Sequence, residues 1–200
     1  MTQPKTLLQL AGVEPTPAPL GQSTLIIIDA QNEYVDGPVA LPGVEDKIAE
    51  IARLLARARA GGSPIVHIQH LGRPGGLFDP EHERSHIVDE LAPRDDETVV
   101  LKGLPNGFAN TDLNDVLRDK GKTSLLVTGF MTHMCVSSTV RSALDHGFSS
   151  TVVASATGTR SLPDATGGAP IDADTLHRAG LAGLSDRFAT IAPDADSVPD

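Results

Sequence analysis

The sequence contains a single cysteine, Cys135, among its 200 residues. One thiol excludes an internal disulfide and a zinc site built from cysteines, and it fits a reducing compartment. Long hydrophobic runs are missing as well: no apolar segment approaches the roughly 18 residues that a membrane-spanning helix needs. The N-terminus has no apolar stretch typical of a signal peptide. We therefore expect a cytoplasmic protein that does not bind membranes.

Positive charge is also scarce in this chain. Sixteen Lys and Arg residues stand against 26 Asp and Glu residues, which gives a formal net charge of −10. This balance argues against a nucleic-acid partner and against binding to anionic membrane surfaces, because both select basic proteins. It does not by itself indicate a cationic substrate.

Short apolar runs rich in β-branched residues recur along the chain and alternate with segments of helical periodicity. The runs predict buried strands at 25–28, 65–68, 98–101, 125–127, 150–153 and 188–191. The longest helical stripe extends from Val44 to Ala58 and ends at Gly61 and Gly62. Strands that alternate with helices predict α/β architecture. We expect a three-layer αβα sandwich around a doubly wound, mainly parallel sheet of about six strands.

The chain divides into an arm, one domain and a tail. Residues 1–20 are rich in proline and poorly periodic, which predicts an irregular arm. Residues 21–192 form the predicted domain, and residues 193–200 are an acidic tail that we expect to be disordered. A long polar stretch between about residues 70 and 96 interrupts the domain, and such loops are usually functional.

Cys135 lies where a predicted strand turns into a predicted helix that Gly147 ends. A helix N-terminus offers free backbone N–H groups and a positive dipole end, and both favour the nucleophilic thiolate. A lone cysteine is also commonly a small buried hydrophobic residue, so position alone leaves both interpretations open.

Asp29 and Lys102 also follow predicted strands directly. The carboxyl ends of parallel strands face the ligand crevice, so these two side chains and Cys135 are expected to converge at one edge of the sheet. A thiol is mostly protonated at pH 7 and needs a base or a cation for activation, which Asp29 and Lys102 would supply. The alternative for Asp29 is a carboxylate that caps the next turn.

Four histidines lie close together in the sequence, namely His67, His70, His82 and His86, with Asp79 among them. His82 and His86 are four residues apart and would share one face of a helix. Such residues can bind zinc or iron, or they can be exposed or contact a substrate. The spacing is loose for a metal site, so we expect neither a metal nor another cofactor.

Three segments together resemble the isochorismatase-like cysteine hydrolases. This family includes nicotinamidases, N-carbamoylsarcosine amidases, streptothricin hydrolases and isochorismatase itself. The segments are LIIIDAQNEY at 25–34, KGLPNGFANTDL at 102–113 and GFMTHMCV at 129–136. Their order and spacing also match, and the likeness extends from about residue 22 to about residue 192.

The resemblance implies a role for each matched residue. Asp29 would act as general acid–base, Lys102 would stabilise the charges, and Cys135 would attack a carbonyl to form an acyl-enzyme. A cis peptide bond is implied at Phe130–Met131, and the N–H groups of Met131 and Cys135 would form an oxyanion hole. The positive charge of Lys102 predicts a thiol pKa below the ~8.5 of free cysteine, although Asp29 acts in the opposite direction.

Two departures from the family pattern narrow the function. Metal-dependent nicotinamidases carry an Asp-x-His pair after the second strand, and here Ile68-Gln69-His70 lacks that aspartate. Isochorismatases cleave a vinyl ether and need no cysteine nucleophile, so Cys135 favours an amidohydrolase acting on the C–N bond of an amide, ureido or lactam group. The alternatives are a vinyl-ether hydrolase and a non-catalytic small-molecule-binding protein of the same fold.

Six residues of the motif turns and the long loop are expected to contact the small-molecule substrate: Tyr34, His70, Phe78, Phe108, Met131 and His133. Phe108 and Met131 would form an apolar wall, and the histidines would add polar selectivity. Family members usually associate, so the resemblance also implies a homo-oligomer.

Overall fold

A computed structural model describes residues 3–200. Its centre is a six-stranded sheet with the order β3-β2-β1-β4-β5-β6. The strands are β1 (Ser23–Ile28), β2 (Ile65–His70), β3 (Thr98–Lys102), β4 (Ser124–Phe130), β5 (Ser149–Gly158) and β6 (Thr190–Ala192). Every neighbouring pair of strands is parallel. The α/β fold class predicted from the sequence is confirmed.

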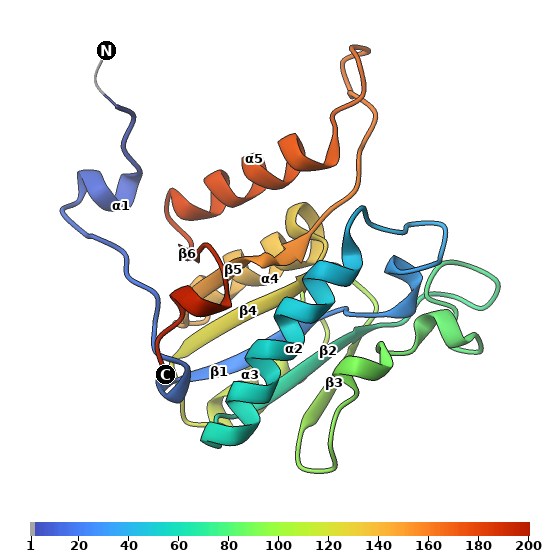
Figure 1. Ribbon diagram of the computed structural model, residues 1–200, viewed down its shortest axis with the longest axis horizontal. Coiled ribbons are helices and arrows are strands. Elements are labelled where there is room, and N and C mark those ends of the chain that lie inside the picture. Colours follow the sequence, from blue (N-terminus) through green and yellow to red (C-terminus); the bar gives the residue numbers. More distant parts are fainter. Residues whose placement is uncertain (1–2) are drawn as a thin grey trace.

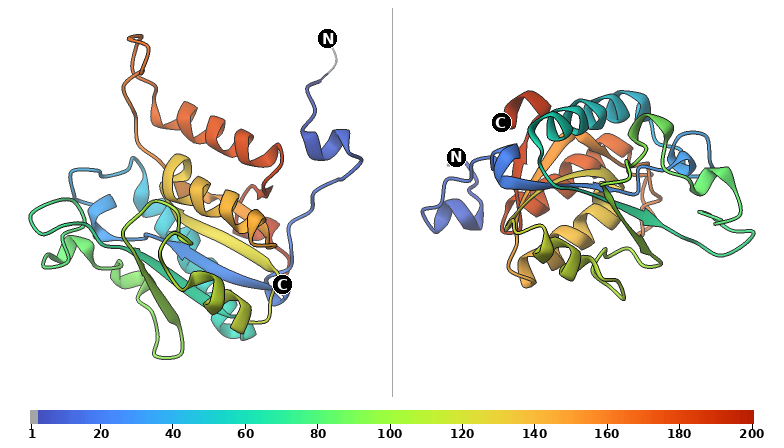
Figure 2. Two further views of the ribbon diagram at one scale, coloured as in Figure 1. Left: turned by 180° about the vertical axis from the view of Figure 1, so that it is seen from behind. Right: turned by 90° about the horizontal axis from the view of Figure 1, so that it is seen from below.

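Helices cover both faces of this sheet (Figures 1 and 2). Helix α2 (Val44–Gly61) lies on one face, and its predicted stripe is the buried side: Val44, Ile48, Ile51, Leu54, Leu55 and Ala58. The opposite face carries α3 (Leu113–Asp119), α4 (Ser137–Asp145) and α5 (Ala173–Ser185). No helix among the described residues combines the length and the hydrophobicity that a membrane crossing requires.

The sheet is doubly wound. The chain moves outward from β1 through β2 to β3, returns to β4 on the other side of β1, and continues outward to β6. The connections that leave the neighbouring strands β1 and β4 therefore lead to opposite halves of the sheet. The carboxyl ends of two such strands form the topological switch point, which is where open α/β sheets bind ligands.

The N-terminal arm contains a short helix that the sequence pattern did not predict. Helix α1 (Leu7–Leu10) starts with a capping box in which Thr6 and Gln9 exchange hydrogen bonds. The Leu7 N–H donates to Asp186 Oδ1 at 2.8 Å, which ties the arm to the end of α5. The prediction of an irregular arm over 1–20 is thus wrong for α1, and residues 1 and 2 lie outside the described part of the chain.

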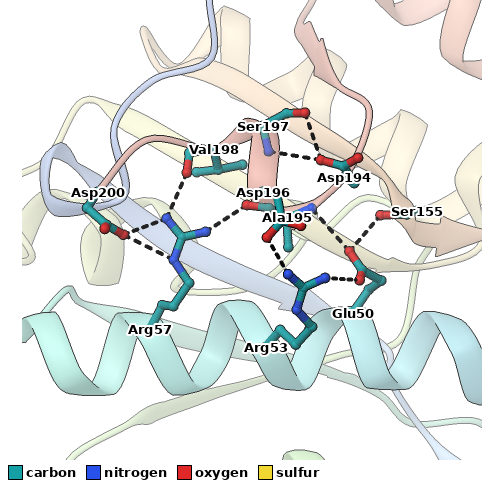
Figure 3. A network of polar contacts seen from close by, with 10 residues as sticks. All are labelled: Glu50, Arg53, Arg57, Ser155, Asp194, Ala195, Asp196, Ser197, Val198 and Asp200. Carbon is teal, nitrogen blue, oxygen red and sulfur yellow. Dashed lines mark hydrogen bonds and ion pairs between the residues drawn. The ribbon is translucent and has the colours of Figure 1, made fainter.

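The C-terminal segment 193–200 is docked on α2 (Figure 3), so the prediction of a disordered tail is wrong. Arg57 donates to two backbone carbonyls of this segment and forms an ion pair with Asp200 at 2.5 Å. Arg53 pairs with the carboxylate of Asp196. The acidic side chains that suggested disorder are acceptors for the arginines of α2.

Candidate active site

The switch point is built on a close approach of two strands. Gly129 of β4 is the register partner of Ile28 of β1. A Cβ atom on Gly129 would collide with the Ile28 backbone, and its φ of 102° lies in the region that favours glycine. Asp29 follows Ile28 with a left-handed φ of 50°, which aspartate tolerates better than most residues. Asp29 and the segment leading to Cys135 therefore leave the sheet side by side.

Lys102 comes from the edge strand β3, where buried and exposed side chains alternate. Val100 and Lys102 are buried, whereas Val99 and Leu101 are exposed. Val100 belongs to the same core cluster as Cys135, so this alternation directs Lys102 to the side of the sheet on which Cys135 lies.

The structure brings the three predicted catalytic side chains together. Lys102 Nζ lies 2.7 Å from Asp29 Oδ2 and 3.4 Å from Cys135 Sγ. The exposed fractions are 0% for Asp29, 3% for Lys102 and 5% for Cys135. The Asp29–Lys102 contact is a buried ion pair at hydrogen-bonding distance, and Asp29 Oδ1 has no hydrogen-bond partner among the described residues. An acceptor of this kind is suited to receive a proton.

Burial controls the protonation of this cluster. It raises the pKa of the Asp29 carboxyl, and the positive charge of Lys102 opposes the rise. Burial and then the Asp29 charge raise the pKa of the Cys135 thiol to about 12, although Lys102 acts to lower it. The prediction of a thiol pKa below that of free cysteine is therefore wrong for this closed site, because the cost of desolvating a thiolate exceeds the help from Lys102.

The segment before the thiol differs from the predicted helix start. Residues Thr132–Val136 form a π-helical turn, and α4 begins only at Ser137. The peptide bond between Phe130 and Met131 is cis. The Met131 carbonyl accepts the Val136 N–H at 3.2 Å, which closes the turn around Cys135.

Three of the predicted substrate-contacting residues form an aromatic cluster next to the three predicted catalytic side chains. The Tyr34 ring packs edge-on against Phe78 at 5.3 Å and against Phe130 at 5.6 Å between ring centroids. Phe78 in turn packs against His70 at 5.0 Å. Met131 is buried in the same core cluster as Tyr34 and Phe78. These residues of the first long loop and the motif turns therefore pack together beside His70, whose strand β2 neighbours β3 with Lys102.

Two other predicted contact residues have different surroundings. His133 Nδ1 lies 2.5 Å from Thr159 Oγ1, just beyond the end of β5, so the ring faces the neighbouring strand. The Phe108 ring stacks on His146 at 4.6 Å, beyond the C-terminal end of α4. The Phe108 ring is therefore partnered by a residue at the C-terminal end of α4, and its contact with a substrate stays a prediction.

Sequence reasoning missed two polar residues at this edge. Gln31 is fully buried: its Nε2 donates to His70 O at 2.9 Å, and its Oε1 accepts the His70 N–H at 2.9 Å. Arg160 follows β5, its Nε is buried without a hydrogen-bond partner among the described residues, and its charge acts on the pKa of both Tyr34 and His133. Gln31 lies inside the family segment 25–34, whereas no sequence pattern indicates a role for Arg160.

The four neighbouring histidines do not form a group of metal-ligating side chains in the described part of the chain. His67 Nε2 bonds Glu97 Oε2 at 2.8 Å, inside the α2 face of the sheet. His82 Nδ1 accepts the Arg84 N–H, and a 3-10 turn at Glu83–Ser85 separates His82 from His86. The two therefore do not share one face of an α-helix, as their spacing had suggested.

The fold and the three side chains agree with one protein family. The family model of the isochorismatase domain matches residues 23–196. The chain belongs to the isochorismatase family. A crystal structure of an isochorismatase from Pseudomonas putida KT2440 superposes with a TM-score of 0.93 at 43% identity, covering 98% of this chain and 100% of that one.

Named relatives support the same assignment. The secreted isochorismatase effector of Verticillium dahliae is 36% identical and covers 94% of this chain and 96% of its own length. Streptothricin hydrolase of Streptomyces noursei is also 36% identical and covers 88% of this chain and 69% of its own length. The chain is thus a hydrolase of the isochorismatase family.

Proposed function

We propose that this protein hydrolyses a C–N bond of an amide, ureido or lactam group in a small molecule, through an acyl-enzyme on Cys135. The observation that carries the proposal is the buried contact of one Lys102 ammonium with both Asp29 Oδ2 and Cys135 Sγ. A carboxylate beside a thiol can exchange a proton with it, and the cation that contacts both groups stabilises either anion. A buried thiol without catalytic work needs neither group.

The first half of the reaction transfers the thiol proton to Asp29 while Sγ attacks the carbonyl carbon. The carbonyl oxygen becomes an oxyanion, which we assign to the backbone N–H groups of Met131 and Cys135. When the tetrahedral intermediate collapses, the C–N bond breaks and Asp29 returns the proton to the leaving nitrogen. The acyl group then remains on Sγ as a thioester.

The second half uses the same groups with water as the nucleophile. Asp29 accepts a proton from the water that attacks the thioester, and the C–S bond breaks as the acid product leaves. The proton returns to Sγ and restores the resting thiol. The Lys102 ammonium contacts both groups and balances the negative charge as it moves between Asp29 and Cys135. No step is assigned to a metal or cofactor.

A vinyl-ether hydrolase is the second candidate, because two similar proteins carry the name isochorismatase. In that chemistry the substrate is protonated and water adds, so a covalent bond to Sγ is not required. Changing Cys135→Ala separates the two candidates. Loss of turnover on amides and ureides by at least about 10³-fold supports nucleophilic catalysis, and retained activity on isochorismate supports the vinyl-ether reaction.

A screen of amides, ureides and lactams, followed by intact mass measurement of the protein, tests the proposal directly. We expect an acyl adduct whose mass maps to Cys135 and disappears in Cys135→Ala. If no substrate of the panel turns over while one of them still raises the melting temperature, the protein is a non-catalytic binder and the proposal fails.

We also propose that the protein forms a homo-oligomer. The arm presents three exposed apolar side chains on or near α1: Leu7, Leu10 and Val13. Exposed apolar groups that lie close together are typical of interaction surfaces. Light scattering coupled to size exclusion is expected to give a multiple of the 20.9 kDa chain mass, and a monomer mass contradicts the proposal.

A further inference from the structure

The Lys102 ammonium has a third partner besides the two triad residues. His70 Nδ1 lies 3.1 Å from Lys102 Nζ, compared with 2.7 Å for Asp29 Oδ2 and 3.4 Å for Cys135 Sγ. A lysine ammonium carries three N–H donors and no acceptor. Three acceptors at these distances match the three donors, so the position of the ammonium is defined by all three contacts.

Three contacts fix the position of His70: its strand pairing, the hydrogen bonds with Gln31 and the packing of Phe78. His70 is the register partner of Lys102 in the β2–β3 ladder, so the two side chains leave neighbouring strands at the same level. Gln31 holds the His70 backbone through both its N–H and its carbonyl. The Phe78 ring contacts the imidazole edge-on. Such support is typical of a side chain whose orientation matters.

We propose that His70 is a positioning residue that holds the Lys102 ammonium between Asp29 and Cys135 through its Nδ1 atom. This assignment rests on the proposed function, because it explains how the charge on Lys102 stays within reach of the sulfur. It replaces the expectation that His70 contacts the substrate. His70 acts through Lys102 and has no bond-making role of its own.

The physical reason is the cost of an unpaired donor in a buried site. Lys102 is 3% exposed, so an N–H group that loses its acceptor cannot turn to bulk water. Without His70 the ammonium would move toward the shorter contact, which is the carboxylate of Asp29. The thiolate of Cys135 would then lose part of its stabilisation, while the ion pair would survive.

The imidazole must be neutral to accept this hydrogen bond. Burial and then the charge of Lys102 lower the pKa of His70 to about 4, so the ring is neutral at pH 7. In the tautomer that accepts from Lys102 at Nδ1, the proton lies on Nε2. The other charged or titratable groups around the cluster are Asp29, Cys135, Tyr34 and Arg160. Burial raises the pKa of Tyr34, so its hydroxyl stays protonated.

A pair of substitutions tests the role of the Nδ1 atom. His70→Asn places an acceptor oxygen at the same number of bonds from Cα as Nδ1, whereas His70→Leu removes the acceptor. The measurement is the rate at which iodoacetamide alkylates Cys135, followed from pH 6 to pH 10, with a melting curve for each variant. We expect His70→Leu to slow alkylation at least about 10-fold at fixed pH and His70→Asn to stay within about 3-fold. The exposed control His86→Leu should match the wild type.

The same measurement in a Lys102→Met background separates this inference from the proposed function. If His70 acts through Lys102, His70→Leu has no further effect once Lys102 is absent, because the two changes share one pathway. Equal alkylation of the His70→Leu and wild-type proteins overturns the positioning role. If Lys102→Met alone leaves alkylation unchanged, Lys102 does not stabilise the Cys135 thiolate. Both the positioning role of His70 and the role of Lys102 in the proposed function are then wrong.

A second measurement needs no variant and so does not depend on whether His70→Leu folds. The ¹⁵N chemical shifts of the His70 ring report which nitrogen is protonated. We expect an unprotonated Nδ1 and a protonated Nε2 from pH 5.5 to pH 9. A ring protonated at Nδ1 at pH 7 cannot accept from Lys102, and this result overturns the proposal.

Discussion

Gly129 and Ile28 are in backbone contact at the carboxyl ends of the paired strands β4 and β1. Gly129→Ala adds a Cβ that collides with the Ile28 backbone and also forces alanine into a φ of 102°. We expect a loss of at least about 2 kcal/mol in the free energy of unfolding. The matched control is Gly147→Ala: Gly147 has a φ of 84°, but a Cβ added there would meet no atom within 4 Å. It should cost about 1 kcal/mol.

Comparing the two alanine variants by chemical denaturation isolates the collision from the backbone strain. The Gly129 variant should also lose activity, because a shift of β4 moves the turn that carries Cys135. If both variants lose the same stability, the close approach of the strands is not what requires glycine at position 129.

Lys102 is expected to make the Cys135 thiol more acidic than it would be beside Asp29 alone. Lys102→Met should therefore raise the thiol pKa further and slow alkylation of Cys135 at pH 8 at least about 10-fold. The exposed Lys5→Met variant is the control for the loss of one positive charge from the surface. An unchanged pH dependence of alkylation in Lys102→Met would contradict the assigned role.

Asp29 is expected to affect thiol acidity and catalysis in opposite directions. Its charge raises the pKa of Cys135, so Asp29→Asn should lower that pKa and speed alkylation at pH 7.5. Turnover should nevertheless fall by about 10²–10⁴-fold, because the asparagine cannot accept and return a proton. The variant should also lose about 3–5 kcal/mol of stability, since Lys102 remains buried without its counter-ion. Alkylation and turnover that fall together would contradict a separate role as acid–base.

The order of strands and helices was readable from the sequence because buried strands and helix stripes have different periods. That order also located Asp29, Lys102 and Cys135 at one sheet edge, since parallel strands end on the same side. Phe108 shows the limit of this reasoning. The direction of an aromatic side chain in a loop depends on tertiary partners, and its partner His146 lies 38 residues further along the chain.

The thiol pKa and the C-terminal tail were mispredicted for related reasons. The sequence shows the charges near Cys135 but not the depth of its burial, which dominates the pKa. The acidic tail looked unstructured because its composition is polar. Arg53 and Arg57, four residues apart on one face of α2, were the available signal for a docked partner.

The Glu97 side chain links Arg59 of α2 to His67 of β2, on the face of the sheet opposite to Cys135. Its carboxylate accepts from Arg59 Nε at 2.7 Å and bonds His67 Nε2 at 2.8 Å, and its side chain is only 4% exposed. Burial acts to raise the pKa of Glu97, but the hydrogen bonds from Arg59 and His67 outweigh it and lower the pKa to about 2. The ordinary value in an unfolded chain is about 4.3.

A depressed pKa in the folded state contributes stability above the unfolded value, and this contribution disappears as the pH falls through the folded value. Glu97→Gln should therefore cost about 1–3 kcal/mol at pH 7, because Arg59 and His67 lose a charged acceptor. The difference from the wild type should shrink between about pH 4.5 and pH 2, where the wild-type carboxylate becomes protonated. Urea unfolding across this pH range measures the difference in the free energy of unfolding between Glu97→Gln and the wild type, with the exposed Glu90→Gln variant as control. If this stability difference stays constant with pH, shape and packing, rather than the charge of Glu97, hold α2 against the sheet.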